Sequence, residues 1–210
     1  MDEQKAAWRA WKEATFGTDY MIWHDGLYTG GIARQQGKAR AETLQMLLLG
    51  LQLGDPVAAE ALGAMGAREA LEGLRALLPN TRGQATVTVA LAIHDLEPDP
   101  ALADEIIEVL RAHPLWGDRI KAAIALRRFP AEKVGDVLLH SVAHDPDYLV
   151  RYHASDSYLR VHDVDPPEIS EHPDIFGDIV TGDERKPAPA DFQRFARAAE
   201  ALRRLGTPGD

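Results

Sequence analysis

The sequence predicts an all-α fold: a right-handed α-α superhelix, or α-solenoid, of about four helix pairs with a helical cap at each end. The main observation is a pair of residues that recurs late in successive helical patterns, as Ala61-Leu62, Ala90-Leu91, Ala125-Leu126 and, with a tyrosine, Tyr158-Leu159. A second apolar face repeats between these pairs, with Leu78, Leu110 and Val142 spaced 32 residues apart. A period of thirty-odd residues that holds two helices is typical of a solenoid, whose units bury their apolar faces only by stacking.

Residues 1–38 are expected to form an aromatic cap before the first repeat. Within residues 3–15, Ala7, Trp8, Trp11 and Ala14 recur at helical spacing and share one face. The following stretch, 16–31, contains several glycines and aspartates and therefore favours turns, with room for a short helix at 20–23. Terminal repeats need such a cover because their outer face would otherwise leave the core exposed.

The repeats are expected to occupy residues 39–161. Apolar residues at helical spacing predict helices at 39–53, 56–65, 67–78, 83–94, 100–112, 117–128, 131–143 and 147–161. Helix breakers separate them, at Gly54, Pro79, Pro98 and Pro130. The stretch 86–89 alternates like a strand, but the surrounding repeat favours a helix there.

The repeat pattern ends in an acidic segment, 162–191, that is rich in proline and glycine. A short helix is expected at about 174–180. Asp191 is expected to be the N-cap of a final helix, 192–205, within a C-terminal part that covers 192–210. We expect the whole chain, 1–210, to form a single repeat domain.

The strongest repeat begins with the aspartate-rich turn Asp145-Pro146-Asp147, continues with the step Val150-Arg151 and Ala154, and closes with Tyr158-Leu159. This pattern resembles the first helix of a HEAT or HEAT-like repeat. Weaker copies around Asp118-Arg119 and Asp55-Pro56 extend the resemblance to about residues 40–161. The resemblance implies a repeat scaffold and does not imply a particular reaction.

Composition excludes several classes of protein. The chain has no cysteine, which removes disulfides and thiolate zinc sites, and no apolar run approaches the ~18 residues of a membrane span. We therefore expect a cytoplasmic protein that does not contact membranes. The net charge is −10, and residues 162–191 carry nine acids against two bases, a net −7. Because nucleic-acid binders normally carry a basic stripe, we expect no nucleic acid and a basic protein as the partner.

Histidine is the main sign of possible chemistry. Four of the eight histidines directly precede an aspartate, at positions 24, 94, 144 and 162, where composition alone predicts about 0.7 such pairs. His140 and His144 are also four residues apart on one helix, and with Asp145 they are the candidate metal ligands.

A HEAT-like metalloenzyme, deoxyhypusine hydroxylase, holds iron with His-Glu pairs, so metal chemistry has to be weighed here. This chain has aspartate instead of glutamate, and its pairs lack the regular spacing of two matched halves. Three of the pairs fall at predicted helix ends, where imidazole suits the carbonyl end of a helix and aspartate suits the following cap. We interpret the pairs as caps, and we expect no metal and no cofactor.

Catalytic motifs are absent from the sequence. It contains no phosphate-binding glycine loop, no Gly-x-Ser-x-Gly elbow and no thiol nucleophile, so we expect a protein that is not an enzyme. The candidate binding residues are aromatic or acidic: Trp23, Tyr28, Tyr148, Tyr152, Asp174, Asp178, Asp183 and Glu184. The aromatic residues have a structural interpretation as cover or repeat packing and a functional one as hot spots of an interface.

We expect a monomer or weak oligomer that binds another protein. The favoured role is an immunity or inhibitor protein that neutralises a basic effector. The alternatives are a metal-dependent enzyme with histidine and aspartate ligands and a chaperone-like or lyase-like HEAT scaffold.

Overall fold

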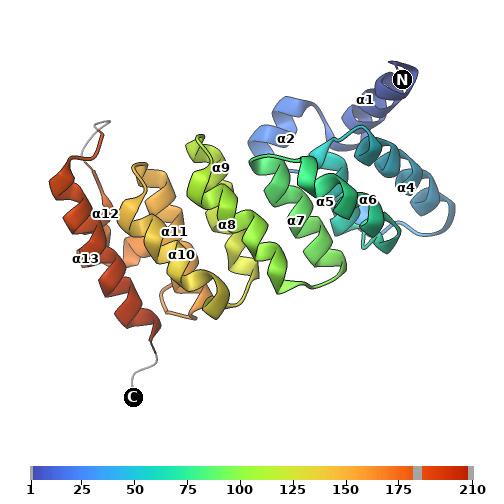
Figure 1. Ribbon diagram of the computed structural model, residues 1–210. Helices are drawn as coiled ribbons and strands as arrows, with labels where there is room; N and C mark the ends of the chain where they lie inside the picture. Colours follow the sequence, from blue (N-terminus) through green and yellow to red (C-terminus); the bar gives the residue numbers. More distant parts are fainter. Residues whose placement is uncertain (1, 182–185, 208–210) are drawn as a thin grey trace. The chain divides into compact units, whose positions relative to one another are not determined.

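The protein is helical throughout the part that the computed structural model describes, residues 2–181 and 186–207 (Figure 1). Those residues form thirteen α-helices and five short 3₁₀ turns, and they contain no β-strand, as the sequence predicts. The helices gather into two compact units, residues 1–99 and 100–210. The division into cap, repeats and C-terminal parts stays a prediction.

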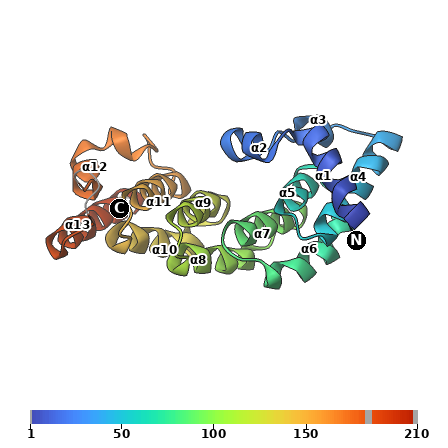
Figure 2. The same cartoon turned by 90° about the horizontal axis from the view of Figure 1, so that it is seen from above.

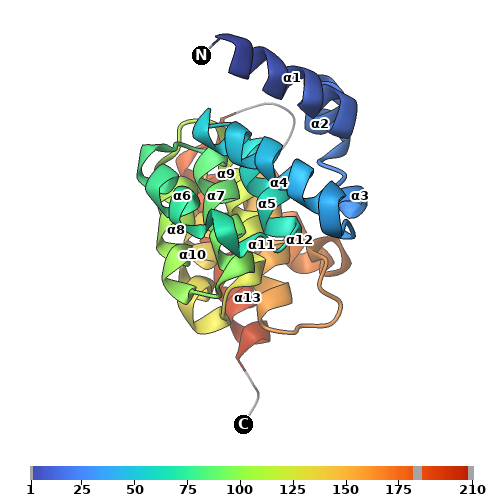
Figure 3. The ribbon, with the colours of Figure 1, turned by 90° about the vertical axis from the view of Figure 1, so that its right-hand side faces the viewer.

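The first unit contains α1 to α7, and its packing centres on α5. The helices are α1 Asp2–Phe16, α2 Asp19–Asp25, α3 Gly30–Ala33, α4 Gly37–Gln52, α5 Pro56–Ala64, α6 Leu71–Leu77 and α7 Gln84–Leu96. Helix α5 packs against α4 and α7, and α6 packs against α7. Helices α2 and α3 lie at the edge of this unit rather than within its stack (Figures 2 and 3).

Helix α1 covers α4 through the indole ring of Trp8. Trp8 is buried, and a Cβ atom added to Gly50 of α4 would lie 2.6 Å from its ring, so the contact requires glycine there. The Trp8 Nε1–H donates to Asp55 Oδ2 at 2.8 Å. Asp55 is also the N-cap of α5, because its Oδ1 accepts a hydrogen bond from the Val57 N–H at 3.0 Å. One carboxylate thus caps α5 and fixes the covering helix.

The recurrent pairs are buried in this unit with one exception. Ala61, Leu62 and Ala90 are fully buried, whereas Leu91 is only half-buried and Ile93 takes the core position. Helix α7 therefore turns a different face inward than the Ala-Leu register predicts. The close contact of α5 with α7 contributes to this difference in the buried face of α7, since Gly63 lies against the backbone of Ala92.

The second unit contains α8 to α13. These are α8 Ala103–Ala112, α9 Trp116–Ala125, α10 Ala131–His144, α11 Tyr148–Val161, α12 Pro173–Ile179 and α13 Pro189–Gly206. Helices α8 and α10 lie in one layer and α9 and α11 in the next (Figure 2), and α13 packs against α10 and α12. The predicted core residues Leu110, Leu126, Val142 and Leu159 are all buried.

The last helix begins earlier than the sequence predicts, and Asp191 is not its N-cap. Helix α13 starts at Pro189, whose fixed φ suits the first helical position. Asp191 is the third helical residue, and its Oδ2 accepts a hydrogen bond from the backbone N–H of Ala188 at 2.8 Å. The carboxylate still stabilises the helix start, but from inside the first turn.

Most of the remaining helix bounds lie within three residues of the predicted ones, but α6 begins at Leu71 and not at residue 67, and α3 was not predicted. No helix in the described part of the chain is both long and apolar enough to cross a membrane.

Two neighbouring positions of the second unit test the burial pattern. Leu126→Asp would place an unpaired charge in the core, because Leu126 is fully buried, and should lower the free energy of unfolding by about 3–5 kcal/mol. Ile124→Asp is the matched control, since Ile124 is 39% exposed; it should cost less than about 1 kcal/mol. Urea unfolding followed by circular dichroism measures both. Equal losses would mean that the assigned face of α9 is wrong.

Candidate functional site

The predicted binding residues belong to surfaces on different units. Trp23 and Tyr28 lie in the first unit, whereas Tyr148, Tyr152 and the two acids Asp174 and Asp178 lie in the second. Asp183 and Glu184 lie outside the described residues. Each surface is therefore considered by itself.

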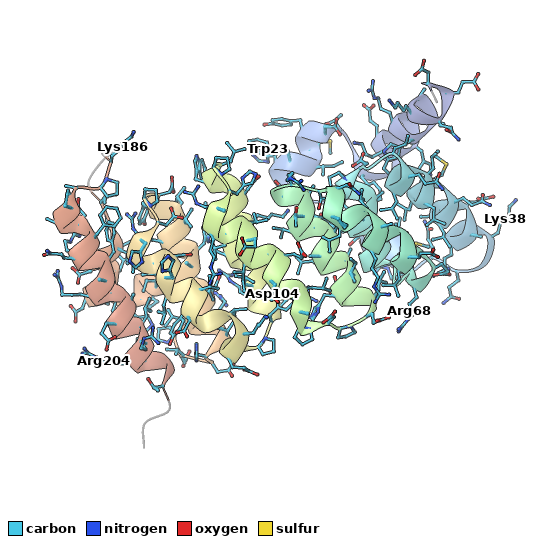
Figure 4. All side chains as sticks on the ribbon, in the orientation of Figure 1. Trp23, Lys38, Arg68, Asp104, Lys186 and Arg204 are labelled. Atoms are coloured by element: carbon cyan, nitrogen blue, oxygen red, sulfur yellow. The ribbon has the colours of Figure 1, made fainter. Side chains whose placement is uncertain are left out.

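The α2 surface consists of the exposed side chains Tyr20, Met21 and Trp23 of α2, and the exposed Tyr28 follows in the segment just after this helix. Trp23 is 77% exposed and Tyr28 74%, and α2 has no buried residue at all. Figure 4 shows Trp23 projecting from α2. The Tyr20 and Trp23 ring centroids lie 6.2 Å apart. A group of large apolar side chains left exposed on a small domain usually marks an interaction site.

Polar contacts fix α2 in place. Lys12 Nζ of α1 lies 2.8 Å from Asp19 Oδ1, and its hydrogen bond lowers the pKa of Asp19. The Thr18 hydroxyl caps the helix by accepting a hydrogen bond from the Met21 N–H at 3.3 Å. These contacts involve only charged and polar groups, and none of them covers the aromatic side chains of α2.

Of the two predicted tyrosines of the second unit, Tyr152 packs against α12 and Tyr148 packs against Tyr152. Tyr148 and Tyr152 are both half-buried, with ring centroids 6.1 Å apart. The Tyr152 ring meets Phe176 edge to face at 6.2 Å, and burial raises the pKa of Tyr148. The half-exposed edges of these rings remain available, but part of each ring has a structural role.

The acidic segment is less free than its sequence suggests. Asp174 is exposed in the first turn of α12. Asp178 instead lies 3.1 Å from Arg197 Nη2 and 3.6 Å from Arg194 Nε, both on α13. The arginines of the last helix therefore neutralise part of the negative charge of the segment before them.

Arg151 ties this segment to α11. The side chain is fully buried, and its Nε and Nη2 donate to the carbonyl oxygen of Ile179 at 3.0 and 2.9 Å. Its Nη1 donates to the Asp145 carbonyl oxygen at 2.8 Å, and its guanidinium carbon lies 3.8 Å from the centre of the Phe195 ring. Burial lowers the pKa of Arg151 to about 10, so the group stays charged at neutral pH.

A second arginine, Arg194, donates hydrogen bonds to the carboxyl end of α12. Arg194 Nη2 donates to the carbonyl oxygens of Gly177 and Val180 at 2.6 and 2.9 Å. Carbonyl groups at a helix C-terminus lack partners within the helix and attract positive charge. The sequence indicated neither contact, because both arginines are distant from residues 177–180 along the chain.

The histidines that precede aspartate make different contacts. His144 Nδ1 lies 3.0 Å from the His140 carbonyl oxygen, and His94 Nδ1 accepts a hydrogen bond from the Asp99 N–H at 3.1 Å. His24 pairs directly with Asp25, and His162 packs on the Tyr158 ring. The first two contacts lie at the ends of α10 and α7, where the sequence places caps.

His140 and His144 border a groove of about 240 Å³ at the carboxyl ends of α8 and α10. Their rings stack with centroids 4.3 Å apart, and burial, His144 and Arg111 lower the pKa of His140. Asp145 is engaged elsewhere: its two oxygens accept bonds from Arg119 Nε and Nη2 at 2.8 and 2.9 Å. That pairing raises the pKa of Arg119.

The groove also contains His113 and Arg111, which the sequence analysis did not select. His113 directly follows α8, and His144 is the last residue of α10. The two histidines lie 31 residues apart, close to the repeat period. The period would have predicted this pairing. Within the described residues, no group of three or more histidine, aspartate or glutamate side chains is already arranged to hold a metal.

Comparisons with protein-family models, with curated proteins and with solved structures find no match for this chain. Its function therefore has to be argued from its own residues.

Arg151 offers a direct stability test. Arg151→Met removes the partner of the Ile179 and Asp145 carbonyl groups and should lower the free energy of unfolding by roughly 3 kcal/mol. Arg160→Met is the matched control on the same helix, since Arg160 is exposed and pairs with Glu168; it should cost less than about 1 kcal/mol. Urea unfolding measures both variants. An Arg151 variant as stable as the control would show that the buried contacts do not stabilise α12.

Proposed function

We propose that this protein is a non-catalytic, HEAT-like helical scaffold that binds another protein, and that the partner is basic. The single observation that carries the proposal is the α2 surface. A seven-residue helix that buries none of its own side chains, and that holds Trp23 and Tyr20 exposed, gains little from packing. Aromatic residues in such positions are the usual anchors of protein interfaces.

The solenoid part of the proposal is supported by repetition within the second unit. Helices α8 and α10 bury Leu110 and Val142, and α9 and α11 are paired with them in turn. The turn before α11 is linked to α9 by the bidentate contact of Arg119 with Asp145. Equivalent burial in successive helix pairs is what stacked repeats require.

The basic character of the partner rests on charge. The chain carries a net −10, and exposed acids such as Asp174 remain on the surface of α12 after Asp178 is paired. Opposite charge on a partner raises the association rate and disfavours acidic competitors. An immunity or inhibitor protein that neutralises a basic effector in the cytoplasm fits this description, with the chain acting as a monomer or weak oligomer.

The role of the aromatic residues can be tested by comparative affinity purification. Wild-type protein, the variant Trp23→Ser with Tyr28→Ser, and the control Trp116→Ser are used as bait for proteins of the native host. The control removes an exposed tryptophan of the second unit. We expect a basic protein that wild type and control retain and that the double variant binds at least about 30-fold more weakly, the loss typical of a hot spot. Equal retention by all three baits would rule out the α2 surface as the binding site.

The charge component requires a separate measurement with the purified partner. Asp174→Lys should slow association several-fold at low ionic strength and leave thermal unfolding unchanged, because Asp174 is exposed. Asp178→Lys should also lower the free energy of unfolding, by about 1 kcal/mol, because it opposes Arg194 and Arg197. Stopped-flow rates over a salt series and melting curves separate the two effects. An association rate that neither salt nor Asp174→Lys changes would contradict a basic partner.

A further inference from the structure

The groove at the ends of α8 and α10 has a chemistry that the protein-binding proposal does not use. Three histidines line it, and its other polar members are two arginines, Ser141 and one carboxylate already engaged by Arg119. All of these residues belong to the second unit.

His140 and His144 have the helical spacing of a pair of imidazole ligands. They lie four residues apart on α10, and their rings stack face to face at 4.3 Å with an angle of 21° between the ring planes, so the rings must turn before both lone pairs can point at one ion. The His144 Nδ1 lies 3.0 Å from the His140 carbonyl oxygen, which can only accept a hydrogen bond. The proton of neutral His144 therefore sits on Nδ1, and its Nε2 keeps a lone pair.

His113 provides a third imidazole on the facing wall. His113 Nδ1 is already engaged, because Asp118 Oδ2 lies 3.1 Å from it and the Leu115 N–H donates to it at 3.4 Å, so Nε2 is the ring nitrogen left for an ion. Asp145, which the sequence grouped with His140 and His144, cannot serve as a ligand without losing its bidentate contact with Arg119. His113 thus takes the place that the sequence gave to Asp145.

The charges around the groove partly favour a cation. Helices α8 and α10 both end there, and the carbonyl end of a helix carries partial negative charge. Arg111 opposes a cation, although Glu108 Oε1 lies 3.7 Å from its Nη1. Replacing Arg111 therefore distinguishes a cation site from an anion site, because loss of its positive charge should strengthen cation binding and weaken anion binding.

We propose that His140 and His144 bind one divalent first-row transition-metal ion through Nε2, in an exchangeable site. Two histidines at positions i and i+4 of a helix can bind the same zinc ion, and imidazole suits zinc, nickel and copper better than it suits magnesium. Water fills the remaining coordination positions, with His113 joining after a side-chain rotation. The site differs from a resident catalytic centre because only two ligands are close together before the ion binds. It does not depend on the protein-binding proposal.

The test is calorimetric titration of tag-free, chelator-treated protein with Zn²⁺, Ni²⁺ or Mg²⁺. We expect binding of one Zn²⁺ or Ni²⁺ ion and none of Mg²⁺. His140→Ala and His144→Ala should each weaken binding at least tenfold, while the control His94→Ala, which alters a histidine of the other unit, should bind like wild type. Circular dichroism checks that each variant is folded. Absence of Zn²⁺ and Ni²⁺ binding, or equal binding by wild type and both α10 variants, would overturn the proposal.

Two further variants define the site. Arg111→Gln should tighten Zn²⁺ binding because it removes a positive charge from the groove wall. Weaker Zn²⁺ binding by this variant, or binding of inorganic phosphate by wild type that Arg111→Gln abolishes, would point to an anion site and overturn the proposal. His113→Ala should weaken Zn²⁺ binding by a smaller factor than the α10 variants. An unchanged affinity would overturn the assignment of His113 as a ligand.

Discussion

The second unit depends on the buried guanidinium of Arg151. Burying an arginine is unfavourable unless its N–H groups find acceptors, and here the carbonyl oxygens of Ile179 and Asp145 and the Thr181 hydroxyl accept hydrogen bonds from all three of its nitrogens. These contacts attach α12 of the acidic segment to α11. Arg194 of α13 holds the carboxyl end of α12 as well. Phe195 then packs against the guanidinium and fixes α13 beside it. One side chain thus connects the three successive helices α11, α12 and α13.

Turn aspartates have a comparable role in both units. Asp55 caps α5 and accepts hydrogen bonds from Trp8 and Lys12 of α1, while Asp145 braces the turn before α11 and pairs with Arg119 of α9. In each case a carboxylate in the turn before a helix binds a donor on an earlier helix. The same short turn therefore sets the end of a helix and the position of its neighbour. These links involve charged residues that the sequence alone would place on the solvent-exposed surface.

Apolar periodicity predicted nearly all helices, because the pattern of buried and exposed positions along a helix involves only residues that are close to one another in the sequence. It failed for Leu91, since the close approach of Gly63 to α7 decides which face of that helix is buried. It also placed Asp191 at the wrong position of the last helix, where Pro189 determines the start. The burial of Arg151 and the pairing of Asp178 were not predictable from local patterns, as both depend on residues 15 or more positions away. Trp23 and Tyr28 are exposed, as the interface interpretation requires, but the sequence alone could not separate that interpretation from a covering role.

Native-state hydrogen exchange of the wild-type protein, followed by mass spectrometry, tests the central claim most directly. If Arg151 and Arg194 hold α12 within the second unit, amides of residues 174–180 should be protected and should open together with those of α11 and α13. A helix of seven residues has little stability by itself, so such protection requires the tertiary contacts. Exchange of residues 174–180 at the rate of an unfolded peptide, while α11 and α13 stay protected, would contradict the claim.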